Sequence, residues 1–394
     1  MTTVGDADDP GASAFTPVWG MPRPLATAGA LPRRAEVVIV GAGITGVTLL
    51  QWLRARDIDA VVLERDRVGS GASGRNAGFL LAGVAENYAS AVARYGRRVA
   101  AEVWAFTLEN HALVAAGEGI SRCGYRRGGS WTVAVDEEEA AALDESAELL
   151  AEDGFDGRPL STAPAHARRV LASDADGEVD PLQLVRTIAE PNASRIHECT
   201  AVAAVDDGDG AATVHTADGS AIEASTVVLA TNAWTAQLLP TVDIRPVRAQ
   251  MLAADGGSAD VPCPAYAERG HRYWRRLADG TLLVGGFRHK AIAEEVGYDL
   301  TPTDLVQGHL ERQLRDLGAP GEVATRWCGT MGFSSDGLPL VGRTAGARSV
   351  VVCGGYTGHG MGFAMHATRL VAAHLLDAAP LPPWLDAARS MPVG

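Results

Sequence analysis

The hydrophobic pattern is clearest in the stretch from Ala35 to Gly78. Glu36 to Val40 is a short apolar run rich in β-branched residues, and Ala60 to Leu63 is another. Such runs predict buried parallel strands. Between the two runs, apolar residues recur at spacings of three, which predicts a helix with one apolar face. These residues are Ile44, Val47, Leu50 and Leu53. The stretch is therefore expected to form a strand–helix–strand unit.

Similar patterns continue along the rest of the chain. Apolar periodicity or a proline in the first turn predicts helices at 97–118, 137–153, 181–188 and 302–317, and a last helix after residue 354. Short apolar runs predict strands at 130–135, 201–205, 227–230, 244–253 and 350–353. Turn signals predict hairpins from 213–216 with 221–224 and from 273–276 with 282–287. Strands that alternate with helices favour an α/β fold.

The loop between the first strand and its helix has the form G-x-G-x-x-G, with glycines at 41, 43 and 46; we call residues 41–46 the phosphate loop. In such a loop the first glycine permits the tight turn and the second lets backbone N–H groups reach a pyrophosphate. The third lets the helix pack on the strand. Glu64 ends the second strand, where an acid can accept hydrogen bonds from ribose hydroxyls. Loop, helix, strand and acid in register predict a dinucleotide site; the alternative is a glycine-rich turn in some other strand–helix–strand unit.

The string GSGASGRNAG at residues 69–78 follows the acid closely. Its small residues would let the loop lie flat against a large ring system, and Ser73 and Asn76 could supply hydrogen bonds. The chain resembles the superfamily of D-amino-acid oxidase, glycine oxidase and sarcosine oxidase. Its SGRNAG form is most similar to the γ-glutamylputrescine oxidase branch. The resemblance covers about Ala35 to Leu376 and implies FAD as cofactor, so we call residues 69–78 the flavin loop.

The resemblance implies cofactor-binding residues in several separate segments. They are Gly41, Gly43, Ile44, Thr45, Gly46, Glu64, Arg65, Ala72, Ser73, Arg75, Asn76, Ala77, Gly78, Val202, Ala230, Thr231, Trp234, Asp336, Gly337, Gly355, Gly358, His359, Gly360 and Met361. In the family, the start of the last helix faces the flavin, where its N–H groups and positive dipole end stabilise negative charge. No metal ligand is expected.

The resemblance also implies a discontinuous Rossmann-like FAD-binding domain and an inserted antiparallel-sheet substrate domain. We expect an N-terminal arm at 1–34, with the first fifteen residues disordered. The FAD-binding domain is expected to comprise 35–118, 179–243 and 325–394, and the substrate domain 119–178 and 244–324.

The expected reaction is oxidation of a C–N bond in an amine or N-substituted amino acid, with hydride transfer to flavin and hydrolysis of the imine. A flavoprotein acting on a C–OH bond, such as that of a 2-hydroxy acid, and a non-catalytic flavin-binding module are alternatives. Tyr273, Arg275, Arg288 and Tyr356 are the substrate-site candidates, with the two arginines available for a carboxylate. No side chain is assigned as a catalytic base.

The sequence departs from the sarcosine oxidase pattern at three cationic positions. Ala82 and Gly362 stand where that pattern has the arginine and lysine that hold the substrate carboxylate. Leu283 or Val284 stands where it has the lysine that speeds reaction with oxygen. We therefore expect a larger substrate held mainly by apolar contacts, and slow reaction with oxygen compared with another electron acceptor. Gly329 stands at the position of covalent cysteine attachment, beside Cys328, so the FAD is expected to be noncovalent.

Composition adds limits on partners and location. The net charge of −14 makes nucleic acid and anionic membranes poor partners. No apolar run is long enough to span a membrane, and the first thirty residues do not have the pattern of a signal peptide. The five cysteines are scattered without a C-x-x-C pair, which argues against a zinc site or disulfide framework and favours the cytoplasm.

Overall fold

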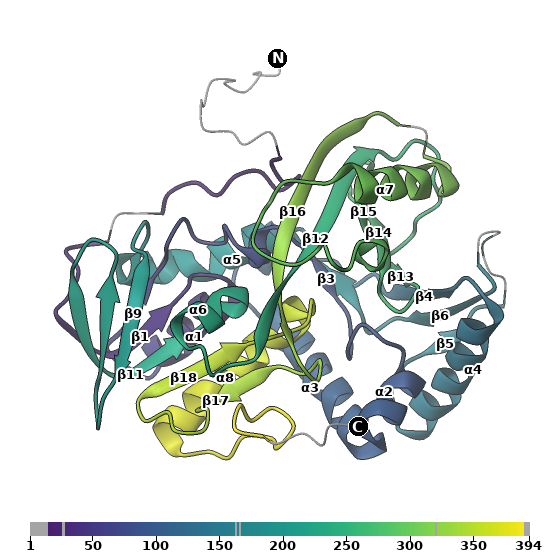
Figure 1. The fold of residues 1–394 in the computed structure, drawn as a ribbon. Coiled ribbons are helices and arrows are strands. Elements are labelled where there is room, and N and C mark those ends of the chain that lie inside the picture. The colour runs from purple at the N-terminus through teal and green to yellow at the C-terminus, as the bar shows by residue number, and fades with distance from the viewer. Residues whose placement is uncertain (1–14, 26–27, 162–163, 165–166, 320, 390–394) are drawn as a thin grey trace.

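A computed structural model describes residues 15–25, 28–161, 164, 167–319 and 321–389 of the chain. Two eight-stranded sheets organise the fold (Figure 1). The first lies with α1 and α8, and the second carries α7 on one side (Figure 1). The helices are α1 Ile44–Arg54, α2 Tyr88–Tyr95, α3 Arg97–Ala115, α4 Glu137–Glu152, α5 Pro181–Ala189, α6 Thr235–Leu238, α7 Asp304–Asp316 and α8 Gly360–Asp377.

The first sheet has a parallel centre in the order β18-β11-β1-β2-β8. Its strands are β1 Arg34–Val40, β2 Ala60–Leu63, β8 Ile196–His197, β9 Val202–Asp207, β10 Ala212–Thr216, β11 Ala221–Leu229, β17 Leu340–Gly342 and β18 Val350–Gly354. β1, α1 and β2 form the predicted strand–helix–strand unit. The ends of β1 and β2 are fully buried, because α1 and α8 cover this part of the sheet.

The second sheet runs in the order β16-β12-β15-β14-β13-β4-β6-β5. Its strands are β4 Ser130–Ala134, β5 Arg158–Pro159, β6 Arg169–Ser173, β12 Ile244–Asp255, β13 Ala265–Ala267, β14 Arg272–Arg276, β15 Thr281–Gly286 and β16 Val323–Ser334. A two-stranded sheet of β3 Phe79–Leu80 and β7 Gly177–Glu178 completes the strands of the described residues. The long strands β12 and β16 reach from the second sheet towards the first (Figure 1).

Local signals explain several helix starts. Asp180 caps α5 by accepting the N–H of Gln183 at 2.9 Å, and Pro181 occupies the first turn as predicted. Asp136 caps α4 in the same way, and three glutamates follow in its first turn. The α/β fold class and the positions of the predicted helices are confirmed within a few residues.

Two strand predictions were wrong. Residues 221–224 and 227–230 are not separate strands, because β11 runs through both, pairing with β10 and β1 along its length. From residue 323 to Ser334 the chain forms β16, which pairs with β12 in the second sheet. The expected domain bounds, including the one at residue 325, stay a prediction.

Residues 15–25, which we call the N-terminal segment, lie against the body of the protein. The expected disorder of the first fifteen residues falls almost entirely on 1–14, outside the described residues. Within the described part, no helix is both long and apolar enough to cross a membrane. All five cysteines are free thiols, and the cytoplasmic location stays a prediction.

Candidate functional site

A long cavity of about 330 Å³ connects the two sheets. At one end, which we call the loop end, it is lined by the phosphate loop, the flavin loop and the residues after β2. At the other, the sheet end, it is lined by side chains from β12 to β16 and from the residues around Phe79. Every predicted site residue lines this cavity except Gly46, Gly78, Arg275, Asp336, Gly337 and Gly355.

The phosphate loop has the backbone geometry that its glycines predict. Gly41 has φ +101°, and a Cβ there would lie 2.9 Å from the carbonyl oxygen of Ala230. At Gly46 a Cβ would lie 1.9 Å from the carbonyl oxygen of Gly41, so only glycine lets α1 start this close to β1. The N–H of Ile44, at the start of α1, donates to Ser73 Oγ at 2.9 Å. This bond joins the phosphate loop to the flavin loop.

The carboxylate of Glu64 lies beneath the phosphate loop at the end of β2. Its Oε2 accepts the N–H of Ala42 at 2.7 Å, and its Oε1 accepts the N–H of Asp66 at 2.8 Å. Burial raises its pKa, and these hydrogen bonds oppose that rise. Next to it, the Arg65 guanidinium lies 4.9 Å from the centre of the Trp234 ring, and Trp234 packs on Tyr298. The loop end therefore places an acid beside a stacked aromatic surface.

The flavin loop is held by hydrogen bonds within itself and by hydrogen bonds to β16. Arg75 donates to the carbonyl oxygens of Ser70 and Cys328, and the indole N–H of Trp327 donates to the carbonyl oxygen of Arg75. Asn76 donates to Ala72 and Ser73 and accepts the N–H of Gly78. These hydrogen bonds define the path of the loop, and the contacts of Ser73 and Asn76 with a cofactor stay a prediction.

Arg275 does not reach the cavity and is a correction to the sequence prediction. Its side chain is buried, and Nη1 donates to the carbonyl oxygens of Ala77, Gly78 and Val179 at 2.9–3.1 Å. Its Nε lies 3.3 Å from the carboxylate of Glu178. A guanidinium committed to three carbonyls and a carboxylate cannot also bind a substrate, so Arg275 stabilises the flavin loop from behind.

The start of α8 faces the cavity. Gly360, Met361 and Gly362 line it, so the N-terminal end of an eighteen-residue helix points at its contents. His359 precedes the helix, and burial lowers its pKa to about 4, which makes it a neutral imidazole at pH 7. Tyr356 also lines the cavity, and its hydroxyl lies 3.0 Å from Thr45 Oγ1.

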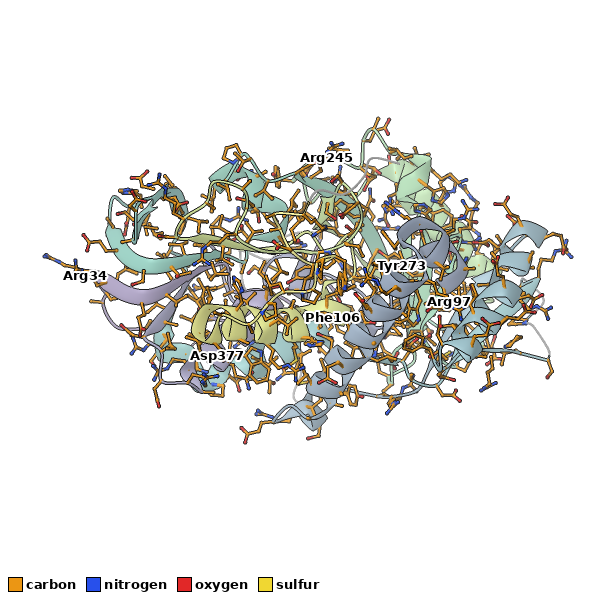
Figure 2. The ribbon with its side chains drawn as sticks, turned by 90° about the horizontal axis from the view of Figure 1, so that it is seen from below. Arg34, Arg97, Phe106, Arg245, Tyr273 and Asp377 are labelled. Carbon is orange, nitrogen blue, oxygen red and sulfur yellow. The ribbon has the colours of Figure 1, made fainter. Side chains whose placement is uncertain are left out.

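The sheet end is walled by aromatic and apolar side chains. Phe79, Tyr266 and Tyr273 form a cluster with ring centres 5.4–6.1 Å apart. Gly285 makes room for Tyr273, because a Cβ there would come within 2.1 Å of the ring. Among the described residues, neither tyrosine hydroxyl has a hydrogen-bond partner, and burial raises the pKa of both. Both phenols are therefore protonated at neutral pH and available to a ligand. In the view of Figure 2, Tyr273 lies within the outline of the molecule and Arg245 lies at its edge.

Arg288 is the free cation of the sheet end. A tight turn brings it there: Gly286 has φ +118° and Phe287 has φ +62°. Its guanidinium lies 5.0 Å from the centre of the Phe333 ring, and no carboxylate within the described ranges pairs with it. Burial lowers its pKa without removing its charge. The geometry therefore leaves one unpaired guanidinium among apolar walls.

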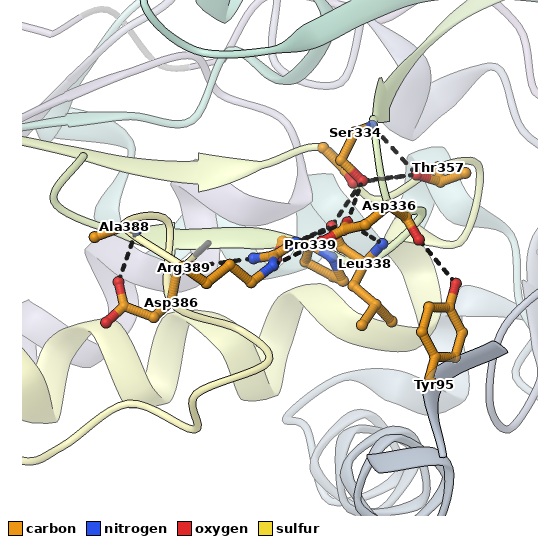
Figure 3. Close-up of polar contacts among 10 residues, drawn as sticks. Tyr95, Ser334, Asp336, Leu338, Pro339, Thr357, Asp386, Ala388 and Arg389 are labelled. Carbon is orange, nitrogen blue, oxygen red and sulfur yellow. Dashed lines mark hydrogen bonds and ion pairs between the residues drawn. The ribbon is translucent and has the colours of Figure 1, made fainter. Parts of the chain in front are cut away.

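The predicted residues Asp336 and Gly337 lie outside the cavity. Both carboxylate oxygens of Asp336 pair with the Arg389 guanidinium at 2.8 and 2.9 Å, and its carbonyl oxygen accepts the hydroxyl of Tyr95 (Figure 3). Asp336 therefore holds Arg389, the last residue that the structure describes. Gly46, Gly78 and Gly355 also lie behind the lining, where each allows a close backbone approach or a positive φ.

Sequence reasoning missed much of the sheet end. Phe79, Leu81, Met251, Tyr266, His271 and Phe333 all line the cavity without having been predicted. Alternation in the second-sheet strands could have suggested the face of Met251 and Tyr266, but no local motif marks the others. Burial lowers the pKa of His271 to about 4, so it too is neutral.

The structure also places the residues that stand where the family pattern has a covalently attached cysteine or the lysine that speeds reaction with oxygen. Gly329 lines the cavity, whereas Cys328 points away from it, with Sγ 3.8 Å from the carbonyl oxygen of Asp299. Leu283 and Val284 are buried within the second sheet. Lys290 is exposed and does not line the cavity.

Comparison with known proteins gives consistent matches. Gamma-glutamylputrescine oxidoreductase of Escherichia coli (strain K12) is 29% identical over 369 residues, covering 86% of this chain and 82% of that protein. The tRNA 5-methylaminomethyl-2-thiouridine biosynthesis bifunctional protein MnmC of a Burkholderia lata strain is 31% identical over 386 residues. That match covers 87% of this chain but only 54% of the larger protein.

Solved structures share the fold at lower identity. Glycine oxidase from Geobacillus kaustophilus has a TM-score of 0.75 and 21% identity, covering 92% of this chain and all of that one. L-proline dehydrogenase from P. horikoshii has a TM-score of 0.76 and 20% identity, covering 91% and 98%. The family model described as FAD dependent oxidoreductase (DAO) matches residues 36–374. The chain therefore belongs to the DAO family of FAD-dependent oxidoreductases.

Proposed function

We propose that this protein oxidises a C–N bond of an amine or N-substituted amino acid that carries a carboxylate, with FAD bound noncovalently. One observation supports this most strongly: an apolar, aromatic cavity end holds one unpaired guanidinium and only weakly basic imidazoles. The guanidinium suits a substrate with a negative charge, and the weakly basic imidazoles suit a reaction in which the protein removes no proton.

The residues at the loop end fit FAD. The phosphate loop is a turn that side chains would fill, since a Cβ at Gly43 would lie 2.8 Å from Ser73 Oγ. Two helix N-terminal ends, those of α1 and α8, face the cavity and suit negatively charged groups. Glu64 and the Arg65–Trp234 surface would hold the adenosine, and the flavin loop would support the ring system.

Bound at the loop end, FAD would supply the oxidant for removal of a hydride from the carbon next to the substrate nitrogen, and hydrolysis of the resulting imine would give a carbonyl compound and an amine. The side chains of the sheet end bind and orient that carbon and exclude water. Their apolar character disfavours an ammonium ion, and the Arg288 charge disfavours it further. The chain's own contribution is thus to select the neutral amine, whose lone pair assists the loss of hydride.

A C–OH substrate would need a stronger base than the cavity provides. An alcohol must lose its hydroxyl proton as hydride leaves, and a base works best when its pKa lies near the working pH. The imidazoles of His271 and His359 both have pKa values of about 4. Among the described lining residues of the sheet end, neither phenols nor Arg288 can accept that proton. The site therefore favours C–N over C–OH oxidation.

Arg288 would bind the substrate carboxylate, with the hydroxyls of Tyr266 and Tyr273 as further donors. A charge-assisted hydrogen bond contributes about 1.5–3 kcal/mol, as much as burying one large apolar side chain. The relatives point the same way by their names: gamma-glutamylputrescine oxidoreductase, glycine oxidase and L-proline dehydrogenase all act on compounds that contain both a carboxylate and a C–N bond.

Noncovalent attachment follows from the placement of Cys328. Its sulfur is turned away from the cavity, and the residue next to it in the lining is Gly329. Acid or heat should therefore release all of the FAD into the supernatant. Flavin that stays with the precipitated protein would contradict this part of the proposal.

The test of the reaction is a substrate panel scored under anaerobic conditions by bleaching of the flavin. The panel pairs N-methylphenylalanine with 3-phenyllactate, which share a carboxylate and a ring but differ in C–N and C–OH. The proposal is supported if N-methylphenylalanine bleaches the flavin and methylamine, released by hydrolysis of the imine, is detected. Bleaching by 3-phenyllactate alone would overturn it in favour of C–OH oxidation.

A further inference from the structure

Side chains from distant parts of the chain donate to the carbonyl groups at the end of the flavin loop. Four successive carbonyl oxygens, at residues 75 to 78, each accept a side-chain donor. Trp327 donates to Arg75, Trp19 donates to Asn76, and Arg275 donates to both Ala77 and Gly78. Three of these four acceptors line the cavity. The donors therefore set the path of the loop that borders the flavin site.

Trp19 is the donor that comes from outside the segment matched by the family. Its indole Nε1 lies 2.9 Å from the carbonyl oxygen of Asn76, and its ring lies 5.3 Å from the Arg275 guanidinium carbon. It also packs against an apolar cluster of Ala77, Met251 and Trp327. One side chain thus contacts both the flavin loop and the arginine that holds the loop.

The rest of the N-terminal segment is fastened on either side of Trp19. The hydroxyl of Thr325, on β16, donates to the carbonyl oxygen of Thr16 at 2.5 Å. The N–H of Leu25 donates to Glu198 at 2.9 Å, and the same carboxylate accepts the N–H of Val68, just before the flavin loop. Arg186 donates to the carbonyl oxygen of Arg23. These anchors hold Trp19 in place from both directions along the chain.

We infer that Trp19 is a positioning residue for the cofactor, and that the N-terminal segment serves as a strap over the back of the flavin loop. Trp19 does not touch the cavity; it acts through the Asn76 carbonyl and through Arg275. Without it, the Asn76 carbonyl loses its donor and the Arg275 guanidinium loses its aromatic cover. The loop would then sample other conformations, and FAD would have to reorder it on binding.

The experiment compares the full-length holoenzyme with Trp19→Ala, Trp19→Phe and Met21→Ala. Phenylalanine keeps a ring over Arg275 but has no N–H, so it isolates the hydrogen bond to Asn76. Met21 belongs to the same segment but is 44% exposed, which makes it the matched control. FAD dissociation is measured by the fluorescence of released flavin, and the flavin environment by visible circular dichroism at saturating FAD.

We expect Trp19→Ala to weaken FAD binding about tenfold and Trp19→Phe about threefold, in line with the loss of one hydrogen bond and one cation–π contact. Met21→Ala should match the wild type. The visible circular dichroism of Trp19→Ala should change even when FAD is saturating. If Trp19→Ala does not fold, Trp19→Phe decides the question.

A purely structural role would give a different result. The FAD-free Trp19→Ala protein would then melt at a lower temperature than FAD-free wild type, while the FAD dissociation constant and the flavin circular dichroism stayed unchanged. That outcome, or wild-type behaviour of both Trp19 variants, would overturn the inference. Failure of the proposed C–N reaction would leave it intact, because every readout here concerns FAD binding rather than turnover.

Discussion

The two ends of the cavity are built in different ways. The loop end is made by short contiguous stretches, whose backbone N–H groups and tight turns form the walls; Gly41 and Gly46 are required by geometry there. The sheet end is made by side chains from β12 to β16 and from Phe79, which meet only in the folded chain. The first end is therefore recorded in local sequence, while the second depends on long-range packing. Substitutions at the two ends should therefore have different effects on the binding of FAD and of substrate analogues.

The largest effect is expected at Gly46 in the loop end. Gly46→Ala would place a Cβ 1.9 Å from the carbonyl oxygen of Gly41, so α1 must move away from β1. We expect loss of bound FAD and several kcal/mol of lost stability, as for other clashes with buried backbone. Flavin content and thermal unfolding measure this. The control is Gly308→Ala in α7, where a Cβ meets nothing within 4 Å and alanine should be neutral or stabilising. A yellow, stable Gly46→Ala protein would contradict the loop geometry.

The sheet end should respond to the loss of its cation without losing FAD. Arg288→Gln is expected to weaken binding of phenylacetate by about ten- to a hundredfold, since a charge-assisted hydrogen bond contributes about 1.5–3 kcal/mol. Binding of the neutral 2-phenylethanol should stay the same. Both ligands are titrated against the flavin absorbance of the holoenzyme. Arg245→Gln, an exposed arginine on the same sheet, is the control for charge. Equal loss of both ligands would show that Arg288 supports the cavity rather than a carboxylate.

A smaller effect is expected when the acid of the loop end is removed. Glu64→Ala should weaken FAD by roughly 1–3 kcal/mol, because the ribose loses an acceptor and the N–H groups of Ala42 and Asp66 lose theirs. Glu64→Gln keeps an acceptor and should lose less. FAD dissociation constants of both variants test the order. Substrate-analogue binding at saturating FAD should not change, and a change there would mean that the two ends are coupled.

The contrast between the two ends explains what the sequence could predict. The phosphate loop, Glu64 and most of the flavin loop were found because their motif and their geometry lie within a few tens of residues. Arg275 was misplaced because its partners lie 198 and 96 residues away, and nothing local shows that it caps carbonyls. Asp336 was misplaced for the same reason, since Arg389 lies 53 residues further on. Tyr266, His271 and Phe333 could be recognised as lining residues only from the folded second sheet.

The fold was predicted well where one pattern holds through an element. β11 was divided in two because its pattern changes along its length: its first residues alternate between exposed and buried, and its last are all buried. The first half pairs with a surface hairpin, and the second lies at the centre of the first sheet. A single strand in two environments has two hydrophobic patterns, and a prediction from local sequence interprets them as two strands.

The smallest effect concerns Asp176, a buried acid behind the sheet end. Its carboxylate accepts the N–H of Ala82 at 2.8 Å and the hydroxyl of Ser130 at 2.6 Å, and no cation pairs with it among the described residues. Burial raises its pKa to about 6. The folded protein therefore binds a proton that the unfolded chain has released between about pH 4 and pH 6. Stability contributed by this group is complete below pH 4 and is lost as pH rises through 6.

Asp176→Asn tests this argument, because asparagine can keep both contacts without a charge. About two pKa units correspond to a ceiling of about 3 kcal/mol, and weaker amide hydrogen bonds offset part of it. We expect the variant to be about 1 kcal/mol more stable than wild type at pH 7.5 and no more stable at pH 4. Urea unfolding at the two pH values measures the difference. A variant less stable than wild type at pH 7.5 would show that the ionised carboxylate is favourable in place, held by a donor beyond Ala82 and Ser130.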